Sequence, residues 1–469
     1  MHDCCGVVGI YAPNEDVARL TFFALFALQH RGQESAGIAT ADGRSLQVYA
    51  NMGLVSQVFD EDSLSKLKGY IAIGHTRYST KGSSRVCNAQ PIVVGEGSNM
   101  MAIAHNGNIV NAEHLYEELS SQGYTFSSST DTEVIANLIV SSPQKDWVGR
   151  IRYAMRRLQG AYSLTIMTKD HLFGVRDPLG VRPLCLGALN GGWVLASESC
   201  ALDHIGANFI REIEPGEIVS IGANGVDSYR EEGGKKALCI FEYIYFARPD
   251  STINGRLLYQ ARQAMGAALA EEHPVAADLV VGVPDSATAA AVGYAQRSGV
   301  PLAEGLIKNR YVGRTFIEPD QRIRDIGVKL KFNPLPQVLG GKRVVLVDDS
   351  IVRGTTTPQV IGLLRKAGAK EVHMRVCAPP IRYPCFFGVD MATYSELIAA
   401  RKTISEIKEL IGADSLGYLS VEGLIKAVAL PRDTFCLACF TGDYPIPVQI
   451  GMDKLALESM PTAQPQAVD

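Results

Sequence analysis

Hydrophobic and polar residues are patterned in two different ways along the chain, and the change falls near residue 230. Up to about Tyr229, short apolar runs such as AYSLTIMT, LFGVRD and GWVLASE alternate with glycine-rich turns and predict strands. Helices are expected at Thr132–Ser141 and Trp147–Leu158. Many strands with helices in separate groups predict an α+β layered domain.

The charged, glycine-containing stretch REEGGKK (Arg230–Lys236) predicts a domain boundary. Beyond it, the strand-like DLVVGV, KRVVLVDD and EVHMRVCAPP alternate with the helix-like ATAAAVGYAQRSG and TPQVIGLLRKAG. This order predicts a parallel sheet with crossover helices, whose ligands bind at the carboxyl ends of the strands. We therefore expect domains at residues 5–232 and 237–454. The polar, proline-containing residues 455–469 are expected to be disordered.

Composition narrows the class of protein. The 469 residues are too many for one core, and 45 Lys and Arg against 49 Asp and Glu argue against a broad nucleic-acid surface. The apolar runs are strand-length, so no membrane span is expected, and the first ten residues have no secretory pattern. Most of the ten cysteines are expected to be buried, reduced thiols in a cytoplasmic protein.

The stretch VVLVDDSIVRGTTT (Val344–Thr357) has the features of a phosphate site. An apolar strand brings Asp348 and Asp349 to its carboxyl end, and a loop of small residues leads into a helix with Thr357 as candidate N-cap and Pro358 as its first residue. Backbone N–H groups at such a helix start converge on an anion. The two carboxylates suit a sugar diol or Mg²⁺ instead, so the ligand should contain both phosphate and ribose.

Two further stretches add to this site. VVGVPDSATAA is a second strand end, and it places Pro284, Asp285 and Ser286 to approach a pyrophosphate or its metal. KNRYVGRTFIEP (Lys308–Pro319) is basic and aromatic without clear periodicity, so it is either an exposed loop or a lid. As a lid, its Lys308, Arg310 and Arg314 would neutralise pyrophosphate on closing.

These motifs resemble known families. VVLVDDSIVRGTTT resembles the phosphoribosyl pyrophosphate (PRPP) motif of type I phosphoribosyltransferases. CGVVGI, LQHRGQESAGIA, GHTRYST, HNGNI and STDTE resemble class II glutamine amidotransferases, which are N-terminal-nucleophile (Ntn) hydrolases. Together, residues 5–450 resemble the glutamine PRPP amidotransferases, in their iron–sulfur branch. The resemblance implies a four-layer αββα domain followed by a phosphoribosyltransferase domain with a parallel sheet.

The resemblance also implies the chemistry of the first domain. Cys5 would be the nucleophile, and removal of a propeptide, Met1–Cys4, would free its α-amine to act as the base. Asn106 and the N–H of Gly107 would form the oxyanion hole. The remaining predicted roles are glutamine carboxylate binding by Arg77, glutamine amine binding by Asp131, support by Arg31, and structural positions for His75 and His105.

For the second domain, the resemblance implies that PRPP reacts with ammonia from glutamine, giving 5-phosphoribosylamine, glutamate and pyrophosphate. This is the first committed step of purine synthesis. The predicted PRPP-binding residues are Lys308, Arg314, Asp348, Asp349, Ser350, Arg353, Gly354, Thr355 and Thr356. The predicted Mg²⁺ ligands are Ser286, Asp348 and Asp349.

Ammonia is protonated in bulk water, so an enclosed apolar passage between the two sites is expected. A homotetramer or dimer and feedback inhibition by purine nucleotides are also implied.

The motif CLACF contains a C-x-x-C pair that on its own is compatible with zinc, redox chemistry or no function. In the resembled branch, similar motifs supply Cys239, Cys385, Cys436 and Cys439 to one [4Fe–4S] cluster, and we expect that cluster here, with structural zinc or an empty site as alternatives. The four cysteines expected to be ordinary core residues are Cys87, Cys185, Cys200 and Cys377.

Two other functions compete with this prediction. Another class II amidotransferase, such as a glucosamine-6-phosphate or asparagine synthetase, would lack the motif DDSIVRGTT. A PRPP-sensing regulatory protein would not need the N-terminal glutaminase motifs. A PRPP-dependent glutaminase assay separates all three functions.

Overall fold

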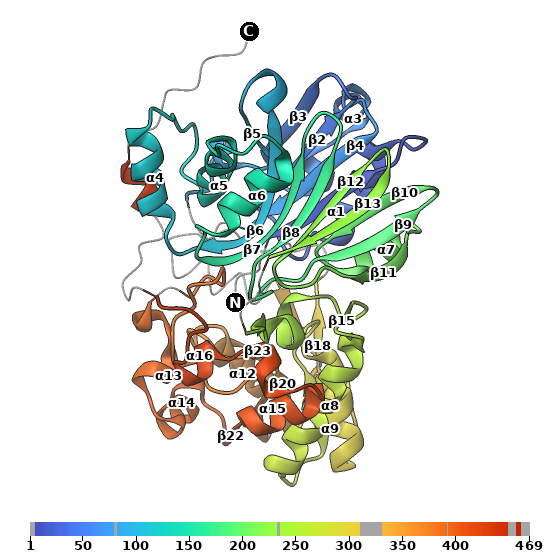
Figure 1. Ribbon diagram of the computed structural model, residues 1–469. Coiled ribbons are helices and arrows are strands. Elements are labelled where there is room, and N and C mark those ends of the chain that lie inside the picture. Colours follow the sequence, from blue (N-terminus) through green and yellow to red (C-terminus); the bar gives the residue numbers. More distant parts are fainter. Residues whose placement is uncertain are drawn as a thin grey trace.

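Two differently built halves make up the chain (Figure 1). The computed structural model describes residues 5–78, 82–231, 235–309, 331–391, 393–448 and 456–460. We call residues 5–231 the first half and residues 235–460 the second half. The predicted propeptide Met1–Cys4 and the lid residues Arg310 and Arg314 lie outside the described residues.

Two antiparallel sheets form the first half. The first sheet has the strand order β11-β9-β10-β1-β4-β2-β3, with β1 at Gly6–Tyr11, β2 at Ser35–Ala41, β3 at Leu46–Met52, β4 at Ile71–Arg77, β9 at Cys185–Leu189, β10 at Gly192–Ala196 and β11 at Asn208–Glu212. The second has the order β13-β12-β8-β7-β6-β5, with β5 at Ile92–Val94, β6 at Met101–Ile109, β7 at Gly160–Met167, β8 at Leu172–Arg176, β12 at Glu217–Gly222 and β13 at Gly225–Arg230.

Helices cover the outer face of each sheet, which completes the four-layer αββα arrangement predicted from the sequence. The first sheet carries α1 (Val17–Ala27), α2 (Val55–Val58), α3 (Glu61–Lys66) and α7 (Ser199–His204), and the second carries α4 (Ala112–Ser121), α5 (Asp131–Val140) and α6 (Trp147–Met155). Val7 and Ile73 from one sheet pack against Ala104 and Leu172 from the other. Side chains from the inner faces of the two sheets interdigitate here and form one core.

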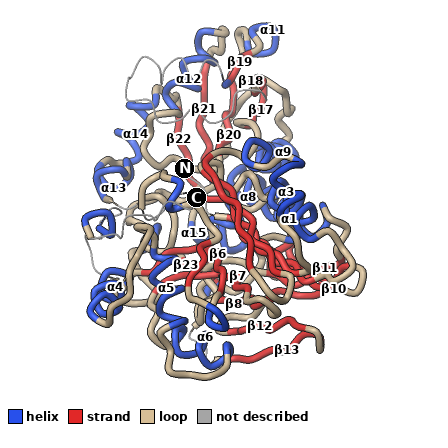
Figure 2. The backbone as a smooth tube through the Cα atoms, turned by 90° about the horizontal axis from the view of Figure 1, so that it is seen from above, coloured by secondary structure: helices blue, strands red, loops and turns tan. Residues whose placement is uncertain are grey.

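A parallel sheet lies at the centre of the second half, as predicted, with the order β17-β20-β21-β22. Its strands are β17 at Leu279–Gly282, β20 at Arg343–Asp348, β21 at Glu371–Val376 and β22 at Ser415–Tyr418. The longer helices are α8 (Leu258–Glu272), α9 (Thr288–Ser298), α12 (Thr357–Lys366), α14 (Ile404–Ile411) and α15 (Val421–Val428). Figure 2 shows the four parallel strands as a group separate from the sheets of the first half.

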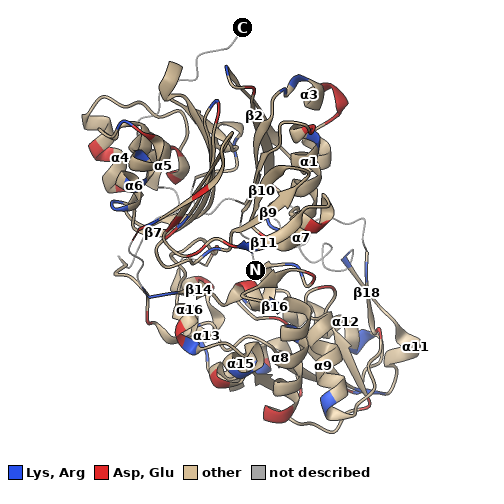
Figure 3. Cartoon of the chain, turned by 45° about the vertical axis from the view of Figure 1, so that its right-hand side comes forward, with Lys and Arg blue, Asp and Glu red and all other residues tan. Residues whose placement is uncertain are grey.

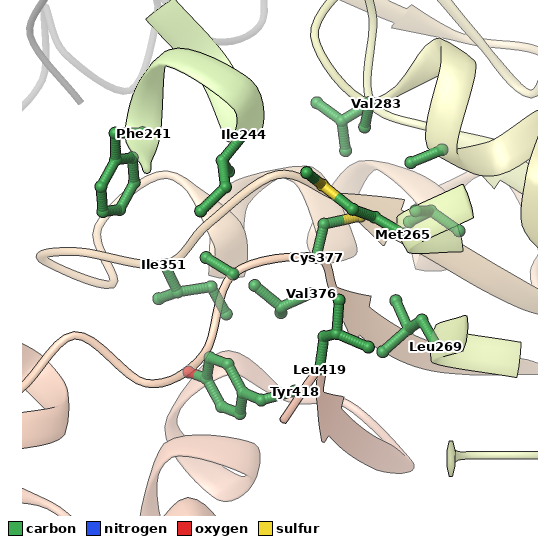
Figure 4. Close-up of a cluster of buried hydrophobic side chains, with 14 of the residues drawn as sticks. Phe241, Ile244, Met265, Leu269, Val283, Ile351, Val376, Cys377, Tyr418 and Leu419 are labelled. Carbon is green, nitrogen blue, oxygen red and sulfur yellow. The ribbon is translucent and has the colours of Figure 1, made fainter. Parts of the chain in front are cut away.

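Short elements join these parts. Three pairs of short strands are β14 (Leu238–Cys239) with β23 (Phe435–Cys436), β15 (Thr252–Ile253) with β16 (Arg256–Leu257), and β18 (Leu306–Lys308) with β19 (Phe332–Pro334). The short helices are α11 (Pro336–Leu339), α13 (Ile398–Arg401) and α16 (Ala438–Thr441), and Glu242–Phe246 forms a π-helical turn. Figure 4 shows Phe241, immediately before this turn, and Ile244, within it, in the same buried cluster as Met265 and Ile351.

Local expectations hold with two corrections. The expected helix Trp147–Leu158 corresponds to α6, and α9 ends at Gly299 in the left-handed conformation that glycine favours. Helix α12, however, begins at Thr357 itself, so Thr356 is its N-cap residue and the prediction for Thr357 was wrong by one position. Thr356 forms no capping hydrogen bond through its side chain.

The second correction concerns the expected disordered tail. Its residues Ala456–Ser459 form a 3₁₀ turn, and Leu457 is buried in the core of the first half. Glu458 accepts hydrogen bonds from the backbone and hydroxyl of Ser83, both at 2.7 Å, and from the hydroxyl of Ser129. The prediction of disorder from composition was therefore wrong for these residues. Leu457 and Glu458 have specific partners far away in the sequence.

Charge is distributed without a single dominant face in the view of Figure 3, where basic and acidic residues are interspersed over both halves. Within the part of the chain that the structure describes, no helix has the length and apolarity needed to cross a membrane.

Candidate active sites

Cys5 lies immediately before β1, the strand at the middle of the first sheet. It is only 6% exposed, and its thiol donates a hydrogen bond to the carbonyl of Tyr78 at 3.3 Å. Burial raises the pKa of the Cys5 thiol above its usual value. A neutral buried thiol is a weak nucleophile, so this cysteine needs a base close by to react.

The predicted oxyanion-hole residues Asn106 and Gly107 lie on β6, in the facing sheet. The side-chain nitrogen and oxygen of Asn106 are both buried, and neither has a hydrogen-bond partner among the described residues. A buried amide left unpaired is unfavourable by about 1–3 kcal/mol, which a native structure retains where a ligand completes it. Gly107 has φ +155°, and a Cβ there would lie 2.0 Å from the carbonyl oxygen of Ala161, so only glycine fits.

Arg77 and Asp131 lie near Cys5. Arg77 ends β4, and the pairing of Gly6 with Thr76 brings it beside Cys5. Its guanidinium, 2% exposed, donates to the carbonyl of Ser83 at 3.1 Å and lies 3.8 Å from the carboxylate of Glu34. Asp131 begins α5 and accepts a hydrogen bond from the N–H of Ile109 at 3.0 Å. A buried cation and a buried carboxylate therefore flank the thiol, as the two charges of a free amino acid would require.

Arg31 forms a hydrogen bond with the backbone of Cys5 that could not be predicted from the sequence. Its Nε donates to the carbonyl oxygen of Cys5 at 2.9 Å, and its terminal nitrogens bind Glu198 and Glu242. Glu198 and Arg31 come from the first half, whereas Glu242 comes from the second. Burial opposes ionisation of Glu198, but the charges of His30 and Arg31 hold the pKa of Glu198 well below its usual range. Glu198 is therefore ionised inside the protein.

The two histidines near the site are structural, in agreement with the sequence prediction. The Nε2–H of His75 donates a hydrogen bond to the carbonyl oxygen of His105 at 3.0 Å. Burial lowers the pKa of His75 to about 3, so the ring is neutral near pH 7. Neither histidine has a hydrogen bond to Cys5 in the structure, where the Cys5 thiol bonds to the Tyr78 carbonyl.

The predicted phosphate loop follows β20 at the carboxyl end of the parallel sheet. Asp349 accepts hydrogen bonds from the hydroxyls of Ser286 and Ser350, which brings the two strand ends together. Gly354 has φ +70°, and a Cβ there would lie 2.5 Å from Ile398, so the tight turn requires glycine. Thr355 and Thr356 are exposed, with their hydroxyls at the start of α12.

Asp348 and Asp349 form an acidic pair at this strand end. Burial and the adjacent charge of Asp349 raise the pKa of Asp348 well above its usual value. The backbone N–H of Asp349 donates to Asp348 at 2.9 Å. Two neighbouring carboxylates of which one resists ionisation fit a site that receives a divalent cation or hydroxyl donors with its ligand.

Basic residues around the loop are paired with nearby acids. Lys308, on β18, forms an ion pair with Asp285 at the end of β17. Arg353 forms one with Glu396, from the turn Tyr394–Glu396. Both cations are partly exposed, so exchange of these partners for phosphate oxygens is sterically possible.

The four predicted cluster cysteines surround one pocket. Cys239 and Cys436 are opposite each other on β14 and β23. They line the pocket together with Cys385, Cys439 and an apolar set, namely Val181, Phe241, Phe387, Val389, Met391 and Tyr444. Burial raises the pKa of Cys239 to about 12 and that of Cys439 well above its usual value. Among the described residues, no group of three or more His, Cys, Asp or Glu side chains is arranged to hold a metal ion.

The other cysteines agree with the prediction except one. Cys185, Cys200 and Cys377 are buried core residues. Cys87 was expected in the core but is exposed, because it lies in the short 3₁₀ turn Val86–Asn88 before β5.

Several acidic residues near the sites were missed by the sequence reasoning, namely Glu34, Glu198, Glu242, Glu396 and Glu458. One of them carried a usable signal: Glu242 is a single acid within the apolar run CIFEYIYF, and a carboxylate in such a run is buried only with a partner. The others lie in polar segments whose partners are set by the tertiary fold.

Comparisons with known proteins cover nearly the whole chain. The glutamine amidotransferase domain family matches residues 75–204, and the phosphoribosyl transferase domain family matches residues 253–382. The amidophosphoribosyltransferase of Synechococcus elongatus is 51% identical, with 98% of this chain and 95% of the relative covered. That of Methanocaldococcus jannaschii is also 51% identical, covering 96% of this chain and 99% of the relative.

A solved structure agrees with these relatives. The glutamine PRPP amidotransferase of B. subtilis, complexed with ADP and GMP, is similar with a TM-score of 0.90 and 46% identity, covering 96% of this chain and 99% of that one.

Proposed function

The chain belongs to the amidophosphoribosyltransferase family, and on this premise we propose how its residues perform the reaction. The substrates are PRPP, glutamine and water, and the products are 5-phosphoribosylamine, glutamate and pyrophosphate. The first half releases ammonia from glutamine, and the second half uses this ammonia to displace pyrophosphate from C1 of PRPP. The enzyme thereby begins purine synthesis.

In the first half, Cys5 is the nucleophile. Its thiolate attacks the side-chain amide carbon of glutamine, and its own α-amine, free after removal of Met1–Cys4, accepts the thiol proton and passes it to the departing ammonia. Water then hydrolyses the thioester to glutamate. The pKa of the thiol, raised by burial, supports the need for such a base.

The charges around Cys5 suit glutamine as the substrate. Arg77 binds the α-carboxylate, and Asp131 binds the α-amine. The Asn106 amide donates to the oxyanion that forms in each tetrahedral intermediate, together with the N–H of Gly107. The observation that carries this half of the proposal is the buried Asn106 side chain, since its polar atoms have no partner among the described residues.

In the second half, the loop from Ser350 to Thr356 binds the 5-phosphate at the start of α12, and Asp348 and Asp349 bind the ribose hydroxyls. Ser286 with this acidic pair would hold Mg²⁺, which supplies positive charge to the leaving pyrophosphate. Lys308 and Arg353 turn from their acidic partners to the phosphates, and Arg314 joins them. The raised pKa of Asp348 supports a cation as part of the complete site.

The four cysteines around the apolar pocket would hold one [4Fe–4S] cluster per subunit. Its role is structural, because Cys239 follows the domain boundary and Cys436 and Cys439 lie near the end of the described chain, so one group ties these segments together. Iron and acid-labile sulfide analysis of anaerobically purified protein tests this, with about four of each per chain expected. Zinc in place of iron would refute the cluster.

Three broader properties follow the family. Purine nucleotides act as feedback inhibitors, which is supported by the B. subtilis relative having been solved with ADP and GMP. The subunits form a tetramer or dimer. The enzyme is cytoplasmic, supported by nine free thiols among the described cysteines, which suits a reducing compartment.

A PRPP-dependent glutaminase assay tests the function. Purified enzyme with glutamine and PRPP should release glutamate and pyrophosphate in equal amounts. Glutamate released without consumption of PRPP would contradict the proposal, because it would indicate another class II amidotransferase.

A further inference from the structure

Four charged residues are buried together where the two halves meet. Arg31 and Glu198 come from the first half, Glu242 comes from the second, and Arg182 lies beside them. Their side chains are 0% exposed. Burying ionised groups is unfavourable even when they are paired, and hydrophobic replacements often stabilise a protein as well. A contribution to stability is therefore a weak explanation for burying these charges. A role in fixing the geometry of the groups that they bind is a better explanation.

Arg31 connects this cluster to the nucleophile. Its Nε donates to the carbonyl oxygen of Cys5, while its two terminal nitrogens donate to Glu242 at 2.8 and 3.0 Å. A guanidinium is planar, so fixing its two terminal nitrogens also fixes the direction of its Nε–H. The carboxylate of Glu242 therefore sets the position from which Arg31 holds Cys5.

Glu242 is itself held from the second half. It begins the π-helical turn Glu242–Phe246; Phe241, just before this turn, and Ile244, within it, lie in the buried cluster of Figure 4. Its Oε1 also accepts from Arg182 at 3.3 Å; Arg182 belongs to the first half but itself donates to the carbonyl of Phe387, in the second half, at 2.8 Å. Glu242 thus has little freedom to move independently of the second half.

A second contact between the halves reaches the oxyanion strand. Asn108, two residues after Asn106 on β6, donates to the carbonyl of Phe386 at 2.8 Å. At Gly388 a Cβ would lie 3.0 Å from the carbonyl carbon of Gly107, so these two backbones are in close contact. The second half therefore reaches Cys5 through Arg31 and packs directly against the oxyanion strand.

We propose that Glu242 is a positioning residue for glutamine hydrolysis, acting from the second half through Arg31 on the backbone of Cys5. It does not touch the substrate. The Sγ and the α-nitrogen of Cys5 share one Cα with the carbonyl that Arg31 holds, so displacement of this carbonyl moves the nucleophile and its base together. The inference rests on the proposed role of Cys5.

The test compares glutamine-dependent with ammonia-dependent formation of phosphoribosylamine in the full-length enzyme. Glu242→Gln should lower kcat with glutamine roughly tenfold to hundredfold, because misplacement of a reacting group by about 1 Å has effects of this size. The KM for glutamine should change less than about threefold, since Arg77 and Asp131 are untouched, and the ammonia-dependent rate should stay within about twofold. A parallel fall of both activities, or an unchanged glutamine kcat, would overturn the inference.

Glu217→Gln is the matched control. Glu217 is a carboxylate of the first half, 3% exposed, that binds Arg211 and Ser228 and has no contact with the Cys5 cluster. The control should keep its glutamine kcat within about twofold of the unmodified enzyme. A selective loss equal to that of Glu242→Gln would show a general effect of removing a buried charge and would overturn the inference.

Two more variants keep the test decisive. If Glu242→Gln does not fold, Glu242→Asp keeps the charge but retracts it by one methylene, and it should still lower the glutamine kcat selectively; equal effects on both activities would contradict the inference. Cys5→Ala separates the two levels of the argument. Retained glutamine activity in Cys5→Ala would refute the proposed nucleophile, whereas its loss together with normal activity in the Glu242 variants would refute only the positioning role.

Discussion

The proposed glutaminase residues of the first half are buried, whereas several residues of the proposed phosphate loop of the second half are exposed. Cys5, Arg77 and Asn106 are each at most 6% exposed. They lie on or beside strands of the two sheets that pack face to face. Arg353, Thr355 and Thr356 lie in a loop at the edge of a single parallel sheet and face solvent. The site around Cys5 is held in place by the core. Parts of the proposed phosphate site reach their final arrangement only with the ligand bound.

The electrostatics of the two sites differ in the same way. Around Cys5, buried cations lie beside buried anions, and the neutral amide of Asn106 has no hydrogen-bond partner among the described residues. Around Asp348, like charges are adjacent, and Lys308 and Arg353 are paired with acids that a phosphate can replace. The first site is prepared for the charge of a transition state, and the second for the charge of a substrate.

The largest effect is expected from Cys5→Ala, which removes the nucleophile from the preformed site. Glutamine-dependent product formation should fall by about 10⁴-fold or more, since no other group replaces a covalent nucleophile. The ammonia-dependent reaction should continue, because it uses only the second half. Parallel rate measurements with glutamine and with ammonium chloride check this, and a loss of both activities would show that the sites are not separable.

Asn106→Ala should have the next largest effect. Removal of one oxyanion donor lowers kcat by about 10²–10³-fold in enzymes that stabilise tetrahedral intermediates. Only the glutamine-dependent rate should fall, with KM for glutamine nearly constant, because the amide acts on the transition state. A rise in KM without a fall in kcat would instead make Asn106 a ground-state binding residue.

Asp349→Asn tests the exposed site. Loss of the charged acceptor should weaken binding of the ribose or its cation by about 1.5–3 kcal/mol, equivalent to roughly 10–100-fold in kcat/KM for PRPP. Unlike the two variants above, it should reduce the reactions with glutamine and with ammonia by the same factor. The measurement is PRPP saturation with each nitrogen source, and a selective loss with glutamine would contradict the assignment.

Glu458→Gln should have the smallest effect. Burial raises the pKa of Glu458, but hydrogen bonds from Ser129 and Ser83 outweigh burial and lower it to about 2, below its ordinary value near 4.5. A depressed carboxyl pKa stabilises the fold above the unfolded value, and this contribution is lost as the pH falls from about 4.5 towards 2. Replacement by Gln should lower Tm by about 2–4 °C near neutral pH.

Thermal scans of both proteins from neutral pH downward check the pH dependence. The difference in Tm should shrink below about pH 4.5 as Glu458 becomes protonated in the unfolded chain. A difference that stays constant down to pH 3 would show that the carboxylate charge is not what holds residues 456–460 in place.

Sequence motifs predicted both fold classes. For the candidate sites, whose roles stay predictions, the sequence is most informative where the site lies in one contiguous segment. The strand–loop–helix of Asp348 to Thr357 is local, so its residue order already fixes which groups meet at the strand end. The C-x-x-C pair found its partners only through the resemblance, because Cys239 lies almost two hundred residues earlier in the chain. Residues whose partners lie far away in the sequence have no local pattern that reveals the partner. Glu242, which forms an ion pair with Arg31, is an example.

The failures have the same physical origin. Ala456–Ser459 has a polar composition, but the contacts of Leu457 and Glu458 with the first half order it. Cys87 belongs to a residue type that is usually buried, but it lies in an exposed turn. In both cases contacts formed in the folded protein determine whether the residue is buried. Neither the periodicity nor the composition of the local sequence encodes these contacts.

The most direct test of the central claim, that a buried glutaminase and an open phosphoribosyltransferase act as one enzyme, follows the nitrogen atom. The enzyme is given PRPP and glutamine labelled with ¹⁵N in its side-chain amide, in the presence of excess unlabelled ammonium at neutral pH. Internal transfer predicts phosphoribosylamine that carries almost only ¹⁵N. Product with the isotope ratio of the bulk ammonium pool would contradict the account.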